Sequence, residues 1–218
     1  MISASYPFFL LYFYLVSITI ETNTFFMKKK EIIWRYILNE ALKKRQFIFT
    51  QKDIASTFHI STCTVFNAIK APRQLGAIEV TGRFFRLKNI EKLLLLWATH
   101  RNFSSDIIYA TSVEKSAREI EGLMPPDIIF GAFSAYRFSH NSAPADYDQV
   151  YVYANELDEI KKRFPVKKGQ ENLFVLKADP YLHSFGNTTP DVQTFVDLWN
   201  IGVWYAKDYL NALKEKIL

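Results

Sequence analysis

One succession of helix and turn signals, between residues 28 and 88, constrains the fold more than any other feature of the chain. Apolar residues at three- and four-residue spacing predict an amphipathic helix over residues 28–45. A short extended segment follows. Thr50, with an acidic residue three positions later, is then typical of the N-cap of a second helix over residues 51–58.

A turn at residues 59–61 has the length that joins the two helices of a helix-turn-helix. Its last residue, Ser61, predicts the N-cap of a third helix over residues 62–75, within which Pro72 should kink the helix or end its regular hydrogen bonding. Helical spacing directs Val65, Ala68 and Ile69 inward. We expect an outer face made of Thr62, Thr64, Asn67, Lys70 and Arg73.

Gly76 ends this segment, and residues 77–88 predict a two-stranded hairpin with its turn at Thr81-Gly82. The second strand carries a cation on each face. Helix, helix-turn-helix and hairpin in this order predict a winged helix-turn-helix, in which a third helix enters the DNA major groove and a basic hairpin meets phosphate or the minor groove. The predicted DNA-binding residues are Ser61, Thr62, Thr64, Asn67, Lys70, Arg73, Arg83 and Arg86.

The distribution of charge favours this interpretation. Of the chain's 218 residues, those from 27 to 88 carry thirteen Lys and Arg against four acids, and those from 89 to 218 carry fourteen against seventeen. A basic module joined to a mildly acidic one predicts that the first part meets a polyanion. A solvated charged face, or a winged helix used for protein contact, remain the alternatives.

The chain offers little for metal or cofactor chemistry. Its single cysteine, Cys63, excludes an intramolecular disulfide, and we expect it to pack beneath the third helix. The four histidines show no metal-ligand spacing, and no Gly-rich phosphate loop exists, so neither a metal nor a cofactor is predicted.

Residues 1–26 form an apolar leader whose central run, residues 7–20, is shorter than the roughly 20 residues that span a bilayer. No Lys or Arg precedes the run, unlike in a signal peptide. We expect Met27 to be the true start, with the leader outside the native fold. A membrane anchor and an ordered helix packed on the domain are the alternatives.

Residues 90–218 predict a second domain of mixed α/β type, behind a DNA-binding domain over residues 27–89. The whole chain is therefore expected to be α+β. The expected helices cover residues 90–97, 112–123, 127–139, 156–164 and 190–217, and the expected strands cover 106–110, 149–153 and 173–176.

The sequence resembles the antitoxins of type IV (abortive-infection, AbiEi-like) toxin–antitoxin systems. The residues that carry the resemblance are Lys70-Ala-Pro-Arg-Gln-Leu-Gly, Gly131-Ala-Phe-Ser-Ala before the strand Gln149-Val-Tyr-Val-Tyr, and Val192-Gln-Thr-Phe-Val-Asp-Leu-Trp-Asn. The resemblance implies a cytoplasmic repressor that binds double-stranded DNA of its own promoter. It also implies a C-terminal domain that counteracts a nucleotidyltransferase-like toxin without a stable complex. Ala132 stands where a second glycine is common in the family.

The rival interpretation is a nucleotidyltransferase-like second domain with an appended DNA-targeting winged helix. Such enzymes place Gly-Gly or Gly-Ser before a strand with carboxylates at i and i+2, which share one strand face and hold Mg²⁺. Gly131, then Asp146 and Asp148, with Asp179 as a third carboxylate, imitate that order. Both of the first two aspartates, however, precede the predicted strand in a loop. We therefore expect a regulator that is not an enzyme and has no catalytic residues; the oligomeric state stays open.

Overall fold

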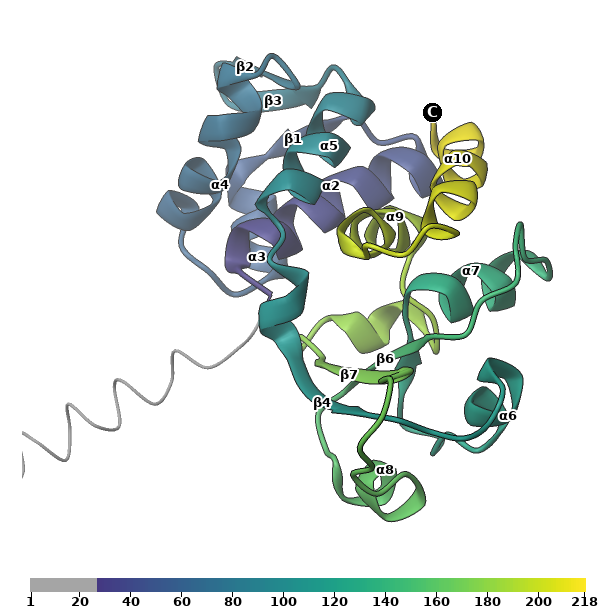
Figure 1. Ribbon diagram of the computed structural model, residues 1–218. Coiled ribbons are helices and arrows are strands. Elements are labelled where there is room, and N and C mark those ends of the chain that lie inside the picture. Colours follow the sequence, from purple (N-terminus) through teal and green to yellow (C-terminus); the bar gives the residue numbers. More distant parts are fainter. Residues whose placement is uncertain (1–26) are drawn as a thin grey trace, which may run out of the picture.

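A computed structural model describes residues 27–218, which form a mixed α+β fold (Figure 1). The α+β expectation is confirmed. All expectations about the apolar leader fall on residues 1–26 and lie outside the described residues. Within residues 27–218, no helix combines the length and the apolar character that crossing a membrane requires.

The first part of the described chain holds three helices and a small sheet. The helices are α2 (Lys29–Lys44), α3 (Gln51–Thr57) and α4 (Thr62–Gln74), and the strands are β1 (Ile48–Thr50), β2 (Ile78–Thr81) and β3 (Phe84–Leu87). β3 lies between β1 and β2 and pairs antiparallel with both. The predicted hairpin is thus confirmed, with its turn one residue later than expected, at Gly82-Arg83, because Thr81 still pairs with Phe84. The short extended segment after α2 joins the hairpin as a third strand because its backbone groups find partners there.

The second part is built around a four-stranded mixed sheet. Its strands are β4 (Ile107–Thr111), β5 (Ile129–Phe130), β6 (Val150–Ala154) and β7 (Leu173–Lys177), in the order β4-β7-β6-β5. β6 and β7 are parallel, and the two outer pairs are antiparallel. The helices are α5 (Ile90–His100), η1 (Phe103–Asp106), α6 (Ala117–Gly122), α7 (Ala132–His140), α8 (Asp158–Arg163), η2 (Leu182–Phe185), α9 (Asp191–Asn200) and α10 (Ala206–Ile217).

This sheet separates two layers of core. On one face, Tyr151 and Tyr153 of β6 join the large apolar cluster that also includes α7, α9 and α10. On the other face, Val150 and Val152 pack with α6 and α8 in a smaller cluster. Because β6 is buried on both faces, its sequence is apolar and aromatic throughout.

The large cluster also runs through the predicted boundary at residue 89. Buried residues of α2, α4, β3 and α5 belong to the same cluster as those of α9 and α10. α9 contacts α2 and α5 on one side and α7 on the other (Figure 1). The division into domains at 89/90 stays a prediction, but the two parts share one continuous core.

The prediction of one helix over residues 190–217 is wrong in one respect, because two helices, α9 and α10, occupy this segment. Ile201, the C-cap of α9, is extended, and Gly202 follows it. The break lets α10 fold back onto α9 and α7, with Tyr209 fully buried. Both helices are amphipathic, so periodicity alone did not distinguish them from one long helix.

Two further expectations are corrected. The helix predicted to begin at Ser112 begins instead after Ser116, which forms a capping box with Glu119. Residues 112–115 do not join the helix, because the side chain of Asn172, just before β7, accepts a hydrogen bond from the backbone N–H of Val113. The helix predicted over residues 127–139 begins only at Ala132, because Ile129 and Phe130 form β5, whose backbone pairs with β6.

A buried ion pair connects α2 to the sheet. Both guanidinium nitrogens of Arg35 lie 2.7 Å from the carboxylate oxygens of Asp179, just after β7, and one also donates to Gln193 of α9 at 2.7 Å. Arg35 and Asp179 are each 1% exposed. A charge this deeply buried is tolerated only with a well-placed partner, so the pair sets how α2 sits on the second part of the chain.

A second buried cluster surrounds Arg101, which follows α5. Its guanidinium contacts three carboxylates: Asp106, Glu31 at 3.6 Å and Asp197 at 3.6 Å. Tyr153 donates to the other oxygen of Asp197 at 2.7 Å. One cation cannot neutralise three carboxylates. Accordingly, burial raises the pKa of Asp197 to about 7, even though Arg101 and Tyr153 oppose the rise.

This cluster predicts a pH dependence of stability. Asp197 stays protonated in the folded chain up to about pH 7, whereas in the unfolded chain it ionises near its ordinary value of 3.8. The folded state therefore holds the extra proton between these values, and the free energy of unfolding should fall as pH rises from about 4 to 7. We expect Asp197→Asn to flatten this decline, measured by urea unfolding at several pH values. The exposed Asp127→Asn should keep the wild-type slope, and an unchanged slope in Asp197→Asn would contradict the assignment.

Candidate nucleic-acid interface

The two short helices α3 and α4 are held by the caps that the sequence predicted. The Thr50 side chain accepts from the Asp53 amide at 3.0 Å, and the Ser61 side chain accepts from the Thr64 amide at 3.1 Å. Between the helices, His59 takes a left-handed backbone conformation with φ of 51°. The two predicted N-caps and the short turn between α3 and α4 are therefore present.

The inner side of α4 packs on α2. Val65, Ala68 and Ile69 are buried as expected, and Trp34 of α2 donates its indole N–H to the Ala68 carbonyl at 2.8 Å. Pro72 lies inside α4 and is buried, and the helix continues only to Gln74. These contacts hold α4 with its opposite side toward solvent.

Two adjacent stripes form the outer side of α4. Helical spacing places Cys63, Asn67, Lys70 and Gln74 along one stripe, and all four are exposed. The same spacing places Thr62, Phe66, Ile69 and Arg73 along the stripe nearer the β2–β3 hairpin, where Ile69 forms the buried base. The face thus mixes cations, amides and one aromatic ring.

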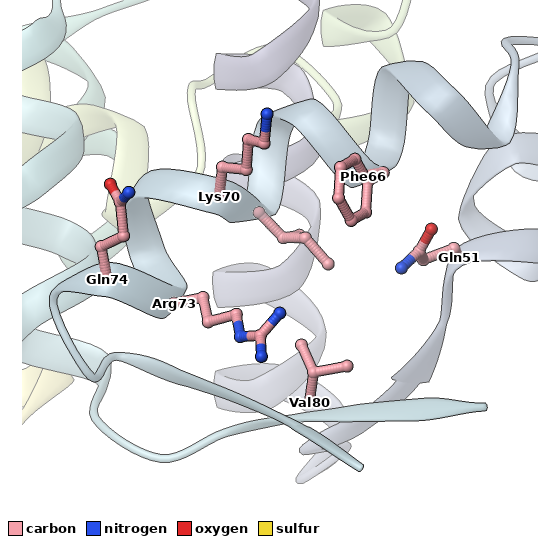
Figure 2. Close-up of a pocket in the computed structure, with 7 residues that line it drawn as sticks. Gln51, Phe66, Lys70, Arg73, Gln74 and Val80 are labelled. Carbon is pink, nitrogen blue, oxygen red and sulfur yellow. The ribbon is translucent and has the colours of Figure 1, made fainter. Parts of the chain in front are cut away.

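A groove of about 360 Å³ lies between α4 and the hairpin, lined by Gln51, Phe66, Ile69, Lys70, Arg73, Gln74 and Val80. In Figure 2, Arg73 extends from the end of α4 into the space facing Val80, while Lys70 ends on the far side of the helix. Of residues 27–218, no acidic one lines the groove. Its chemistry therefore suits a ligand that carries negative charge and hydrogen-bonding edges.

The four cations that the sequence predicts to bind DNA are open to solvent. Among residues 27–218, none forms an ion pair with Lys70, Arg73, Arg83 or Arg86, and all four are exposed. The buried pair of Arg35 with Asp179 and the contact of Glu31 with Arg101 remove one cation and one acid from the surface of residues 27–88. Glu40 is buried as well, at 7% exposed, so that surface keeps twelve cations against two acids, Asp53 and Glu79.

The structure does not bring all of the predicted residues together. Thr62, Asn67, Lys70 and Arg73 lie on the outer face of α4, whereas Ser61 and Thr64 are occupied by capping and hydrogen-bond each other at 2.9 Å. Arg83 lies at the hairpin turn. Arg86 leaves β3 on the face opposite to Phe85, and its cross-strand partner is Glu79. Since Phe85 is buried and pairs with Val80 of the groove, Arg86 points away from α4.

The expectation for Cys63 is wrong. Its thiol is exposed on the outer stripe of α4, and the Asn67 amide lies 3.7 Å from its sulfur. The buried positions of α4 are already filled by Val65, Ala68 and Ile69, and helical spacing puts Cys63 on the opposite side.

Three residues that line the groove, Phe66, Gln74 and Gln51, were not predicted from the sequence. Phe66 and Gln74 lie four residues before and after Lys70, a spacing that was available in the sequence. Phe66 passed unnoticed because an aromatic residue in a helix is usually core. Gln51 comes from α3, so only the tertiary arrangement brings it here.

The rival carboxylates do not assemble into a metal site. Asp179 is engaged by Arg35, and Asp148 accepts from the Tyr205 hydroxyl; Asp146 and Asp148 are exposed in the loop before β6. No group of three or more potential ligands is found within residues 27–218. The two residues of β6 nearest to Gly131 are Tyr151 and Tyr153, which are spaced i and i+2 like the carboxylates of a nucleotidyltransferase. The Tyr153 ring lies so close to Gly131 that a Cβ atom there would be 3.0 Å from it.

Comparison with known proteins adds no relative: no protein-family model, no curated protein and no solved structure matches the chain. The geometry of the site is therefore the basis for assigning a function.

The exposure of Cys63 makes the site directly observable. We expect the native protein to react with one equivalent of a thiol reagent such as dithionitrobenzoate as fast as the urea-unfolded chain does, within about tenfold. Cys63→Ser should show no reaction and should unfold within about 0.5 kcal/mol of the wild type, as an exposed substitution does. A thiol that reacts only after unfolding would restore the expectation of a packed cysteine.

Proposed function

We propose that the chain is a cytoplasmic DNA-binding transcriptional regulator whose residues 27–89 form a winged helix-turn-helix. In this proposal α4 is the recognition helix, the β2–β3 hairpin is the wing, and the target is duplex DNA of the chain's own promoter. The observation that carries the proposal is the outer side of α4, where cations and amides line a groove that, within the described part of the chain, holds no acid.

The size and chemistry of this surface support a major-groove contact. B-DNA's major groove admits a single α-helix, and amide and guanidinium groups match base edges there. α4 presents Asn67, Lys70 and Arg73 on its open side, and α2 supports it from behind through Trp34. Arg83 at the hairpin turn stands where a phosphate or minor-groove contact is expected of a wing.

Arg86 and the capping residues take reduced roles in this proposal. The side chain of Arg86 departs from the hairpin face turned away from α4, so it meets phosphate rather than a base. Ser61 and Thr64 keep the helix start in place through their mutual hydrogen bond. The specific contacts are assigned to the middle and the end of α4.

For residues 90–218, we propose the role implied by the resemblance to type IV antitoxins, counteracting a nucleotidyltransferase toxin without a stable complex. The proposed protein represses its own operon and is not an enzyme. The alternative of a nucleotidyltransferase-like enzyme draws on one observation, the succession β5, Gly131 at the N-cap of α7, and β6. Against it, β6 carries tyrosines where the carboxylates of such enzymes belong, and Tyr153 is committed to Asp197.

The proposal predicts salt-dependent binding to duplex DNA taken from upstream of the chain's own coding sequence. Lys70→Ala and Arg73→Ala should each weaken binding by on the order of 1–3 kcal/mol where the side chain reads a base, and should lower the salt slope where it meets phosphate. Electrophoretic mobility shifts at several salt concentrations measure both quantities. Lys168→Ala, an exposed lysine of the second part, is the matched control and should bind like the wild type. Equal binding by the wild type and all three variants would contradict the assignment of α4 as the recognition helix.

The alternative enzyme is tested through its two loop aspartates. We expect the purified protein to transfer no nucleotide from labelled NTPs to RNA or protein with Mg²⁺ or Mn²⁺. We expect Asp146→Asn with Asp148→Asn to leave repression and antitoxin activity unchanged. The cost in stability should stay near 1 kcal/mol, because asparagine still offers Tyr205 an acceptor. Label incorporation that the double substitution abolishes would favour the enzyme instead.

A further inference from the structure

An aromatic ring stands exposed in the middle of the basic groove. Phe66 is 44% exposed. It lies on the same face of α4 as Arg73 and one helical turn before Lys70. Two aliphatic side chains also line the groove: Ile69, which is 2% exposed, and Val80 of β2, which lies across the groove from α4 (Figure 2). The groove therefore offers an apolar spot surrounded by cations and amides.

The position of Phe66 is not explained by the packing of the protein. The core side of α4 is filled by Val65, Ala68, Ile69 and Pro72, and the ring lies outside that layer. Lys70 places its ammonium 5.4 Å from the centre of the ring, which keeps a cation beside the apolar surface. A ligand that covers the ring must present an apolar group close to negative charge.

Duplex DNA has one such group on its base edges. In the major groove the C5-methyl of thymine is the apolar feature, set among hydrogen-bonding atoms and flanked by phosphates, and it contacts side chains such as phenylalanine. The adenine paired with that thymine presents a donor and an acceptor that glutamine or asparagine can bind together. The groove carries the amide of Gln51 at the Phe66 end, and the amide of Gln74 two helical turns away at its other end (Figure 2).

We propose that Phe66 is a specificity-determining residue that receives the 5-methyl group of a thymine in the bound duplex. This inference rests on the proposed DNA-binding function and adds the chemical class of base that the groove selects. The methyl group packs against the ring above Ile69, while Lys70 and Arg73 hold the neighbouring phosphate or base edge. Uracil, which lacks the methyl group, leaves the ring uncovered.

The test uses the promoter duplex prepared in two forms, one containing thymine and one containing deoxyuridine at every thymine position. Mobility shifts with the full chain measure the ratio of the two dissociation constants. Burying one methyl-sized group changes an equilibrium by about fourfold, so the wild type should bind the thymine duplex about fourfold more tightly or better. Phe66→Ala should bring that ratio close to one by weakening binding to the thymine duplex alone.

A second exposed phenylalanine gives the matched control. Phe84 is 53% exposed on β3, on the hairpin face that points away from α4, and Phe84→Ala should keep the wild-type ratio. A wild-type ratio near one, with DNA binding intact, overturns the inference and leaves the proposed function standing. A ratio that persists in Phe66→Ala also overturns it, because the effect then comes from the shape of the DNA. A single-stranded oligonucleotide that competes as well as the duplex would assign Phe66 to base stacking instead. If neither duplex binds, it is the proposed function that fails.

Discussion

The buried pair of Arg35 and Asp179 is the interaction on which the arrangement of the whole molecule depends. Both side chains are withdrawn from water, and each is stabilised only by the other and by the polar groups around it. Because Arg35 lies on α2 and Asp179 follows β7, satisfying the pair places α2 against the end of the mixed sheet. The same helix carries Trp34, whose hydrogen bond to Ala68 supports α4. One helix thus links the sheet of the second part to the proposed DNA-binding face.

The Arg101 cluster reinforces this link with a different balance of charge. Glu31 of α2, Asp106 and Asp197 of α9 all approach one guanidinium, so the three elements share a single buried site. Burial raises the pKa of both Glu31 and Asp197, since the dry surroundings disfavour their ionised forms. The connection between the two parts is consequently polar as well as apolar. Its polar component is sensitive to protonation, while the continuous apolar cluster around it is not.

The surface of α4 combines three features of different chemistry. Long cations remain free of ion pairs, amides line the groove, and a large ring stays in water beside them. Each feature alone is an ordinary surface property. Together, on a helix that α2 supports from behind, they are the basis of the proposed binding to DNA. In the second part, by contrast, two of the three carboxylates that the rival interpretation needs, Asp148 and Asp179, have partners within the protein. Asp179 is engaged by Arg35, and the strand beside Gly131 carries tyrosines.

The sequence by itself determined the elements whose signals are local. The caps at Thr50 and Ser61, the turn before α4, the hairpin and the inward face of α4 were all predictable, because capping and helical periodicity depend on residues a few positions apart. Tertiary structure alone decided three kinds of feature. It broke the last helix at Ile201 so that α10 could pack back on α9, and it turned residues 129 and 130 into an edge strand by offering them β6. It also paired Arg35 with a residue 144 positions away and brought Gln51 to Phe66 and Arg73. Such choices follow from which partners are within reach after folding, and no local pattern in the sequence records them.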